Sequence, residues 1–281
     1  MDVERVAGAA EFLVRTEGLR AAEPVLTNVM GSVAQSVAAG REYAAEYWWL
    51  VRDHSGVVGC AMRTAPWNLL VSPMSGDAAR SLATAVGVND PGLPGITGPR
   101  KVVDAVTEAL ARAGPVGARS ARLAMTDVVY ELGRFVPPAG VAGAPRLARH
   151  DELELMVAWH EQFALDAGVP SHDSRSSVES RLSERAIWCW ELDGQLVAMA
   201  AHAPPVRTPG GVVGRIGPVY TPSQWRRRGF GAAITAAVVA RLQPVCSTIM
   251  LFADAANPTS NGVYARLGFR ATAEVVEVRF D

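Results

Sequence analysis

Two similar aromatic β-hairpins, one in each half of the chain, are the feature that most constrains the fold. The first covers residues 47–62 and turns at Asp53-His54-Ser55-Gly56, and the second covers residues 187–202 and turns at Asp193-Gly194. Aspartate and glycine are typical of the turns that join antiparallel strands. A predicted helix precedes each hairpin, over residues 24–46 and 176–185. This weak internal repeat predicts that the chain is a duplication of one unit.

A proline- and glycine-rich segment separates the two halves. Residues 136–145 read Val-Pro-Pro-Ala-Gly-Val-Ala-Gly-Ala-Pro, a composition that favours extended, poorly packed chain. The length of 281 residues also exceeds that of most single domains. We therefore expect two domains, over residues 1–140 and 146–281.

The C-terminal half alternates between strand and helix patterns. A short strand over residues 146–149 and a helix capped by Asp151 precede its hairpin. After the hairpin, strands are predicted over residues 211–219, 247–252 and 274–280, and helices over residues 232–242 and 259–267. This order predicts an α/β or α+β fold.

Composition and charge exclude several classes of protein. With 49% hydrophobic and 20% charged residues the chain has the composition of a globular protein, and its net charge of −1 gives no field that attracts nucleic acid or an anionic membrane. Cys60, Cys189 and Cys246 are widely spaced in apolar runs, which suits buried thiols in a reducing cytoplasm and offers no metal-binding spacing. The N-terminus resembles no signal sequence, and no apolar run reaches the ~20 residues of a membrane helix. We expect a cytoplasmic protein that binds no metal, nucleic acid or membrane.

A basic, glycine-containing loop connects a predicted strand to a predicted helix. The loop reads Arg226-Arg227-Arg228-Gly229-Phe230-Gly231, and the helix after it carries an apolar stripe. A helix N-terminus presents unpaired N–H groups and positive dipole to an anion, and the glycines remove side chains from the approach path. The arginines add charge. This segment predicts a diphosphate site.

Two ordered motifs resemble those of the Gcn5-related N-acetyltransferase (GNAT) family. Arg226-x-x-Gly229-x-Gly231, preceded by Val219-Tyr220-Thr221-Pro222, resembles the family's pyrophosphate-binding motif. The downstream run from Ile249 through Asn257, Asn261 and Tyr264 to Leu267-Gly268-Phe269 resembles its second motif. The resemblance covers about residues 146–280. It implies a mixed, mostly antiparallel sheet flanked by helices and, with the internal repeat, a tandem of two such folds.

The resemblance also implies a role for each residue of the two motifs. Acetyl-coenzyme A is the implied co-substrate, and Tyr264 corresponds to the residue that protonates the departing thiolate; a phenol keeps its proton at neutral pH. The alternative for Tyr264 is a core residue, and Asn257 before Pro258 also reads as a helix cap. The implied cofactor-binding residues are Val219, Tyr220, Thr221, Arg226, Arg227, Arg228, Gly229, Phe230, Gly231, Asn257 and Asn261.

The general base is where the sequence departs from the family pattern. Many members carry a glutamate on the strand that corresponds to residues 212–219, but this strand has no carboxylate. Glu191, His202 and Asp254 are near in the chain, and each also reads as an ordinary structural residue. None is assigned as the base.

The first half resembles the family only in outline. At the place of the arginine-glycine loop we expect the segment 92–99, before a helix over residues 100–113, and no basic cluster accompanies it. The first half is therefore interpreted as a degenerate copy that covers the acceptor groove without binding its own cofactor. Trp48, Trp49 and Trp67 are expected to be divided between the core and the groove wall, with the core favoured.

The resulting hypothesis is an enzyme that transfers an acetyl group from acetyl-coenzyme A to a primary amine by direct attack. The alternative is a non-catalytic acyl-coenzyme A sensor or interaction protein of the same fold. A Rossmann enzyme is disfavoured because Ile234 occupies the third glycine position, and one short basic run is too little for nucleic acid. Small amines, amino acids, antibiotics and protein N-termini stay open as acceptors, and so does the oligomeric state.

Overall fold

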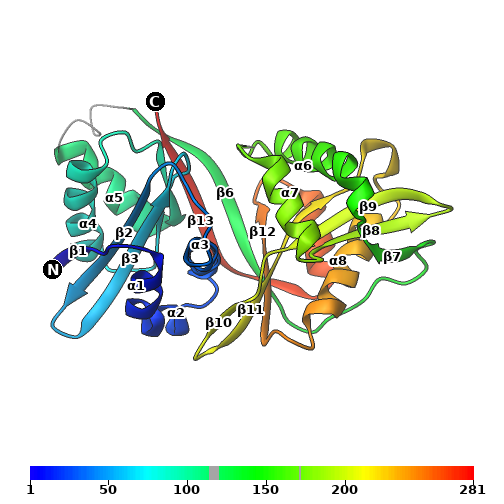
Figure 1. Ribbon diagram of the computed structural model, residues 1–281, viewed down its shortest axis with the longest axis horizontal. Helices are drawn as coiled ribbons and strands as arrows, with labels where there is room; N and C mark the ends of the chain where they lie inside the picture. Colours follow the sequence, from blue (N-terminus) through cyan, green and yellow to red (C-terminus); the bar gives the residue numbers. More distant parts are fainter. Residues whose placement is uncertain (114–119, 171) are drawn as a thin grey trace. The chain divides into compact units, whose positions relative to one another are not determined.

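The computed structural model describes residues 1–113, 120–170 and 172–281. They form two compact units that are not simply consecutive along the chain (Figure 1). Unit 1 contains Met1–Val128, Val206–Gly211 and Ala273–Asp281, and unit 2 contains Val129–Pro205 and Val212–Thr272. Strands β6 (Ala121–Leu132) and β13 (Phe269–Phe280) therefore contribute residues to both units. The expected boundary at residues 140–146 stays a prediction.

Unit 1 contains a mostly antiparallel sheet with the strand order β1-β2-β3-β4-β5-β13. Its single parallel pair among the described residues joins β4 to β5. Helices α4 and α5 lie side by side, and α5 begins at the residue that follows β5 (Figure 1). Besides part of β6 and of β13, its elements are β1 (Asp2–Arg5), α1 (Ala9–Arg15), α2 (Glu17–Ala22), α3 (Asn28–Ala38), β2 (Glu46–Asp53), β3 (Gly56–Thr64), β4 (Leu69–Val71), α4 (Gly76–Asn89), β5 (Gly95–Pro99), α5 (Arg100–Ala113) and β10 (Val206–Thr208).

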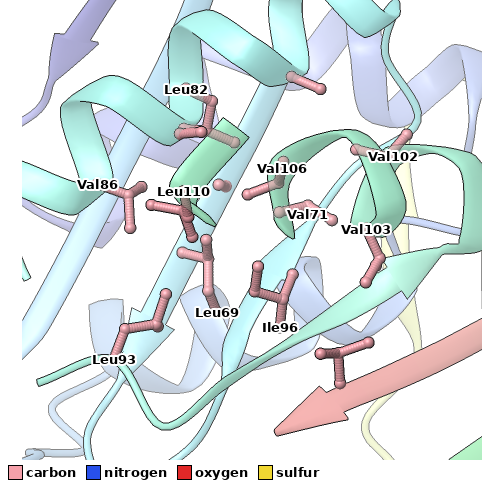
Figure 2. Close-up of a cluster of buried hydrophobic side chains, with 14 of the residues drawn as sticks. Leu69, Val71, Leu82, Val86, Leu93, Ile96, Val102, Val103, Val106 and Leu110 are labelled. Atoms are coloured by element: carbon pink, nitrogen blue, oxygen red, sulfur yellow. The ribbon is translucent and has the colours of Figure 1, made fainter. Parts of the chain in front are cut away.

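Both faces of the unit 1 sheet are buried. On one face β4 and β5 pack against α4 and α5 through side chains such as Leu69, Leu82 and Val106 (Figure 2). On the other face Trp48 packs against Phe12 of α1. Successive side chains of a strand point to opposite faces, so two buried faces require the nearly continuous apolar run of the first hairpin.

The tryptophans of the first half differ in their environment. Trp48 and Trp49 are each 1% exposed, one on each face of the sheet, as expected for core residues. Trp67 is 37% exposed and is therefore not a core residue. It follows the end of β3 at Thr64, where the chain has left the sheet.

Unit 2 has the strand order β6-β12-β11-β9-β8-β7, again mostly antiparallel. Helices α6 and α7 pack on one face through Met156, Val178 and Leu182, and α8 contacts β8 and β9. This arrangement confirms the predicted mixed sheet flanked by helices. The elements are β7 (Ala144–Leu147), α6 (Leu153–Ala167), α7 (Ser174–Ser183), β8 (Ile187–Leu192), β9 (Gln195–His202), β11 (Gly211–Tyr220), α8 (Phe230–Leu242), β12 (Thr248–Asp254), α9 (Pro258–Arg266) and the start of β13.

The two halves of the chain repeat one order of elements. The series β2-β3-β4-α4-β5-α5-β6 corresponds to β8-β9-β11-α8-β12-α9-β13, and in each series the strand before the first helix pairs in parallel with the strand after it. Both predicted hairpins are present as β2/β3 and β8/β9. The counterpart of the arginine-glycine loop is consequently residues 72–75, between β4 and α4. Its expected location at 92–99 was wrong, because residues 95–99 form β5.

Among the described residues, no helix combines the length and the apolar character needed to cross a membrane. Cys60 and Cys189 are buried, and Cys246 is partly exposed. Burial raises the pKa of the Cys60 and Cys189 thiols to about 12.

Candidate functional site

Strands β11 and β12 separate at their C-terminal ends. Their parallel pairing runs from Val213 opposite Thr248 to Ile216 opposite Leu251. Between Ile216 and Val219 the register of β11 against β9 shifts, and Gly217 adopts a φ of 145°, a backbone conformation that favours glycine. Val219 and Tyr220 then pair with β9 alone among the described strands. The edge of β11 that faces β12 is thereby left with backbone donors and acceptors for another partner.

The N-terminus of α8 has no side-chain cap among the described residues. Its N-cap is Gly229, with a φ of 86°, and the Gly229 carbonyl accepts the helix's hydrogen bond from the Ala233 N–H at 3.0 Å. The preceding amides of the first turn have no partner within the helix. A Cβ added at Gly231 would lie 3.5 Å from Thr221 Oγ1, an ordinary contact, so local packing does not require glycine there. These features form the cradle expected of an anion site.

The three arginines of the loop have different environments. Arg226 donates from Nε to the Thr221 carbonyl at 2.9 Å and forms an ion pair with Asp166 of α6. Arg228 lies over the ring of Trp225, 4.8 Å from its centroid. Arg227 and Arg228 are exposed near the start of α8. Arg226 is thus held to the protein, whereas the other two are the better placed of the three for a phosphate.

The segment before β7 packs against this loop. Val141 lies beside Gly229, such that a Cβ added at Gly229 would be 3.2 Å from Val141 Cγ2. Trp190 Nε1 donates to the Ala142 carbonyl at 2.8 Å. Gly143 has a φ of 99° and lies close to the backbone of β8. The expectation of poorly packed chain was wrong for residues 141–143, because these long-range contacts fix them to unit 2.

Helix α9 begins at Asn257, which caps it. Asn257 Oδ1 accepts a hydrogen bond from the Ser260 N–H at 3.0 Å, so its carbonyl is engaged in the helix cap. Asn261 donates from Nδ2 to the Asp254 carbonyl at 3.1 Å. Its Oδ1 is buried and has no hydrogen-bond partner among the described residues. A buried acceptor without a donor costs free energy, so Asn261 is suited to receive a donor from a bound molecule.

Tyr264 lies on α9 and is 9% exposed. Its ring packs against Tyr130 and Phe269 with centroid distances of 6.2 and 6.1 Å. Burial raises its pKa to about 12, so the phenol keeps its proton at neutral pH. Tyr264 is therefore packed like a core residue and also carries a proton that it is able to donate.

The three carboxylate or imidazole groups near the site are each engaged in local contacts. Glu191 pairs with Arg146 at 2.5 Å, His202 Nδ1 lies 3.0 Å from the Ala203 carbonyl, and Asp254 Oδ1 accepts from the Ala256 N–H at 2.8 Å. Burial lowers the pKa of His202, while its contact with the Ala203 carbonyl opposes that shift. These contacts give no reason to assign any of the three groups as the general base.

Comparison with known proteins agrees with the fold. Residues 182–278 match the family model described as FR47-like protein. A GNAT-family acetyltransferase from Colwellia psychrerythraea is 12% identical, with 100% of both chains covered and a TM-score of 0.60. A GCN5-related N-acetyltransferase from Kribbella flavida is 17% identical over 91% of this chain and 95% of that one, with a TM-score of 0.59. A tandem GNAT protein from the clavulanic acid biosynthesis pathway is 14% identical over 99% and 98%, with a TM-score of 0.57.

These similarities identify the fold. The chain has the GNAT fold, and the match to the FR47-like family model lies in its C-terminal half. No curated protein matches the sequence. The identities to the solved structures are low, so these similarities establish the fold and leave the activity to be inferred from the site.

Proposed function

We propose that the chain is an N-acetyltransferase that binds acetyl-coenzyme A in unit 2 and transfers the acetyl group to a primary amine. The observation that supports this most directly is the uncapped start of α8 beside the point where β11 and β12 separate. One feature offers several N–H groups to a diphosphate, and the other offers a backbone edge to an extended chain with amide groups. Coenzyme A contains both chemical groups in this order.

Each motif residue has a proposed part in holding the co-substrate. The backbone of Val219, Tyr220 and Thr221 hydrogen-bonds the pantetheine arm. The amides of Gly229, Phe230 and Gly231 bind the diphosphate, Arg227 and Arg228 supply charge, and Arg226 fixes the loop through Asp166 and the Thr221 carbonyl. The carbonyl of Asn261 receives a donor, and Asn257 supports it by capping α9.

The chemistry assigned to the chain is electrostatic stabilisation and proton donation. Acetyl-coenzyme A supplies the thioester that the amine attacks. Backbone N–H groups at the end of β11 polarise its carbonyl, an effect whose donors are typically worth a few kcal/mol each. Tyr264, protonated because burial raises its pKa, donates the proton that the departing thiolate takes up. The amine needs to lose a proton to attack, and this step is left to water or to the substrate itself.

Gly231→Leu tests the proposed binding site without straining the backbone. The added Cβ meets only an ordinary contact with Thr221, so the fold is expected to persist while the longer side chain blocks the diphosphate. We expect acetyl-coenzyme A affinity, measured by calorimetry, to fall at least about tenfold, which is 1.4 kcal/mol. Ala240→Leu, an exposed position on the same helix, is the matched control. Unchanged affinity in the Gly231 variant would remove the diphosphate assignment.

A non-catalytic acyl-coenzyme A sensor or interaction protein is the second candidate. The engagement of Glu191, His202 and Asp254 in local contacts favours it, because each candidate base already has a structural partner. Coenzyme A thiol release over a panel of amines distinguishes the two functions. Tight binding of acetyl-coenzyme A with no release from any amine identifies the sensor.

The protein is proposed to work in the cytoplasm, with a distinct role for its first half. Three cysteines, two of them buried, suit a reducing cytoplasm. The first half is proposed to be a degenerate copy of the same fold without its own cofactor, so that the chain is a tandem GNAT protein. Its proposed task is to cover the acceptor groove, and the proposed partner is a small-molecule or peptide amine, with neither nucleic acid nor a membrane.

A further inference from the structure

Arg215 is the only charged residue of β11. It lies opposite Met250 of β12, one residue before the final pair of Ile216 and Leu251 at which the two strands separate. In the proposed function the acetyl group lies at this separation. The charged group nearest along the strand to the reacting atoms is therefore a guanidinium.

The side chain of Arg215 lies on the face of the sheet that α6 and α7 cover. Its neighbour Gly214 faces α8, since a Cβ added there would be 2.8 Å from Cys246 Sγ and 3.1 Å from Leu242 Cδ1. Successive residues of a strand alternate between faces, so Arg215 points the opposite way. On that side Val178 and Leu182 of α7 pack against the sheet.

Helix α7 presents polar side chains to the same region. Ser174, Ser177 and Arg181 are spaced by three and four residues, which places them on one side of the helix next to the buried Val178. Arg181 hydrogen-bonds Ser177, and Ser174 Oγ lies 3.0 Å from His160 Nδ1 of α6. Arg181 of α7 is near enough to act electrostatically on both Arg215 of β11 and His160 of α6, so three elements contribute to this polar cluster.

Electrostatics make this cluster receptive to an anion. Burial, and then the charge of Arg181, lower the pKa of Arg215 to about 10, so Arg215 is still a cation at neutral pH. Burial and the same arginine lower the pKa of His160 to about 4, which leaves the imidazole neutral. Hydrogen bonds from a charged guanidinium to a carboxylate are stronger in such a partly desolvated region than in water.

We propose that Arg215 and Arg181 bind a carboxylate of the acceptor, so that the acceptor is an amino acid or a similar amine with a carboxylate a few bonds from its nitrogen. This inference rests on the proposed function for the position of the amine. The planar guanidinium matches a carboxylate with two parallel hydrogen bonds. The short separation follows because Arg215 is on the strand whose end holds the acetyl group.

Paired substrates test the inference by kinetics. The rate of coenzyme A thiol release is measured for the common amino acids and, in parallel, for their methyl amides, which keep the amine and lose the negative charge. We expect at least a tenfold higher kcat/KM for the acids. Equal or better use of the amides would overturn the proposal.

A binding measurement tests the same site when acetyl transfer itself fails. N-acetyl amino acids and their methyl amides are titrated by calorimetry into the full chain saturated with coenzyme A. Tighter binding of the acids supports the carboxylate site whether or not any amine is acetylated, and equal binding, or binding of neither, overturns it. The proposed function fails separately, through absent thiol release or absent acetyl-coenzyme A binding.

Variants assign the effect to the two arginines. Arg215→Gln and Arg181→Gln each remove one charge, and each is expected to weaken binding of the acids about 10- to 100-fold while acetyl-coenzyme A affinity is kept. Arg175→Gln on α7, whose arginine pairs with Glu154 at 2.7 Å on the surface, is the matched control. Circular dichroism and thermal unfolding confirm that each variant is folded. Acid binding that is unchanged in both folded variants contradicts the assignment.

Discussion

The junctions β4–α4 and β11–α8 occupy the same place in the repeated order of elements, yet they differ in every feature that a phosphate site needs. The first is short, and Ser75 caps α4 by accepting a hydrogen bond from the Ala78 N–H at 3.2 Å. The second is longer, carries arginines and has glycine at the cap. A helix whose own side chain binds its first amides has fewer donors to offer a ligand.

The strands beside the two junctions differ in the same direction. A Cβ added at Gly98 of β5 would lie 2.6 Å from the Val71 carbonyl of β4, so these strands approach closely where β4 ends. In unit 2 the matched pairs of β11 and β12 stop at Ile216 and Leu251. One fold thus provides a closed junction in the first half and an open one in the second. The difference teaches that the order of elements alone does not create the proposed cofactor site.

The largest expected effect concerns a buried ion pair in the first half of the chain, which has the closed junction. Arg63 donates to both carboxylate oxygens of Asp90 at 2.7 and 2.6 Å, and both side chains are buried. Removing one partner of a buried pair costs about 3–5 kcal/mol, so Asp90→Ala should lower the free energy of unfolding by that amount. Asp166→Ala breaks the exposed pair with Arg226 and should cost about 0–1 kcal/mol. Denaturant unfolding measures both free energies. Equal losses of stability in the two variants would contradict the expected difference between a buried and an exposed ion pair.

The next effect concerns chemistry that only the second half is proposed to perform. Tyr264→Phe removes the proton donor and keeps the ring packed against Tyr130 and Phe269. We expect kcat for thiol release to fall about a hundredfold while the dissociation constant of acetyl-coenzyme A is nearly unchanged. Tyr47→Phe in the first half, on a ring that stacks on Trp49, is the control. Full turnover in the Tyr264 variant would reduce this tyrosine to a packing residue.

The smallest effect concerns the cap itself. Ser75→Ala should lower the free energy of unfolding by about 1 kcal/mol, because the Ala78 N–H loses its acceptor. Acetyl-coenzyme A affinity should not change, since the closed junction is proposed to hold no ligand. Thermal unfolding and calorimetry measure the two quantities. A weakened affinity in this variant would mean that the first half takes part in binding.

The sequence predicted the local features of the fold. Both hairpins, the helix after Gly229 and the strand-helix order of the second half were visible because they depend on periodicity, turn residues and glycine positions within short segments. The cap at Asn257 was equally local. The counterpart of the arginine-glycine loop was misplaced because β4 has only three residues, too few for a periodic pattern.

The remaining features of the site depend on contacts between distant residues. Asp166 and Arg226 are on a helix and a loop far apart in the chain, and neither residue type signals the pair. The contact of Val141 with Gly229 could not be predicted, because Val141 is in a segment whose composition is typical of a linker. The orphaned carbonyl of Asn261 and the cation cluster around Arg215 likewise require knowledge of what surrounds each side chain.

The stoichiometry of acetyl-coenzyme A binding tests the central claim most directly. Calorimetric titration of the full chain should give one site, and the Gly231→Leu variant should bind at least about tenfold more weakly at that site. Two sites in each chain, or one site whose affinity the Gly231 substitution leaves unchanged, would contradict the account that only the open junction of the second half holds the co-substrate.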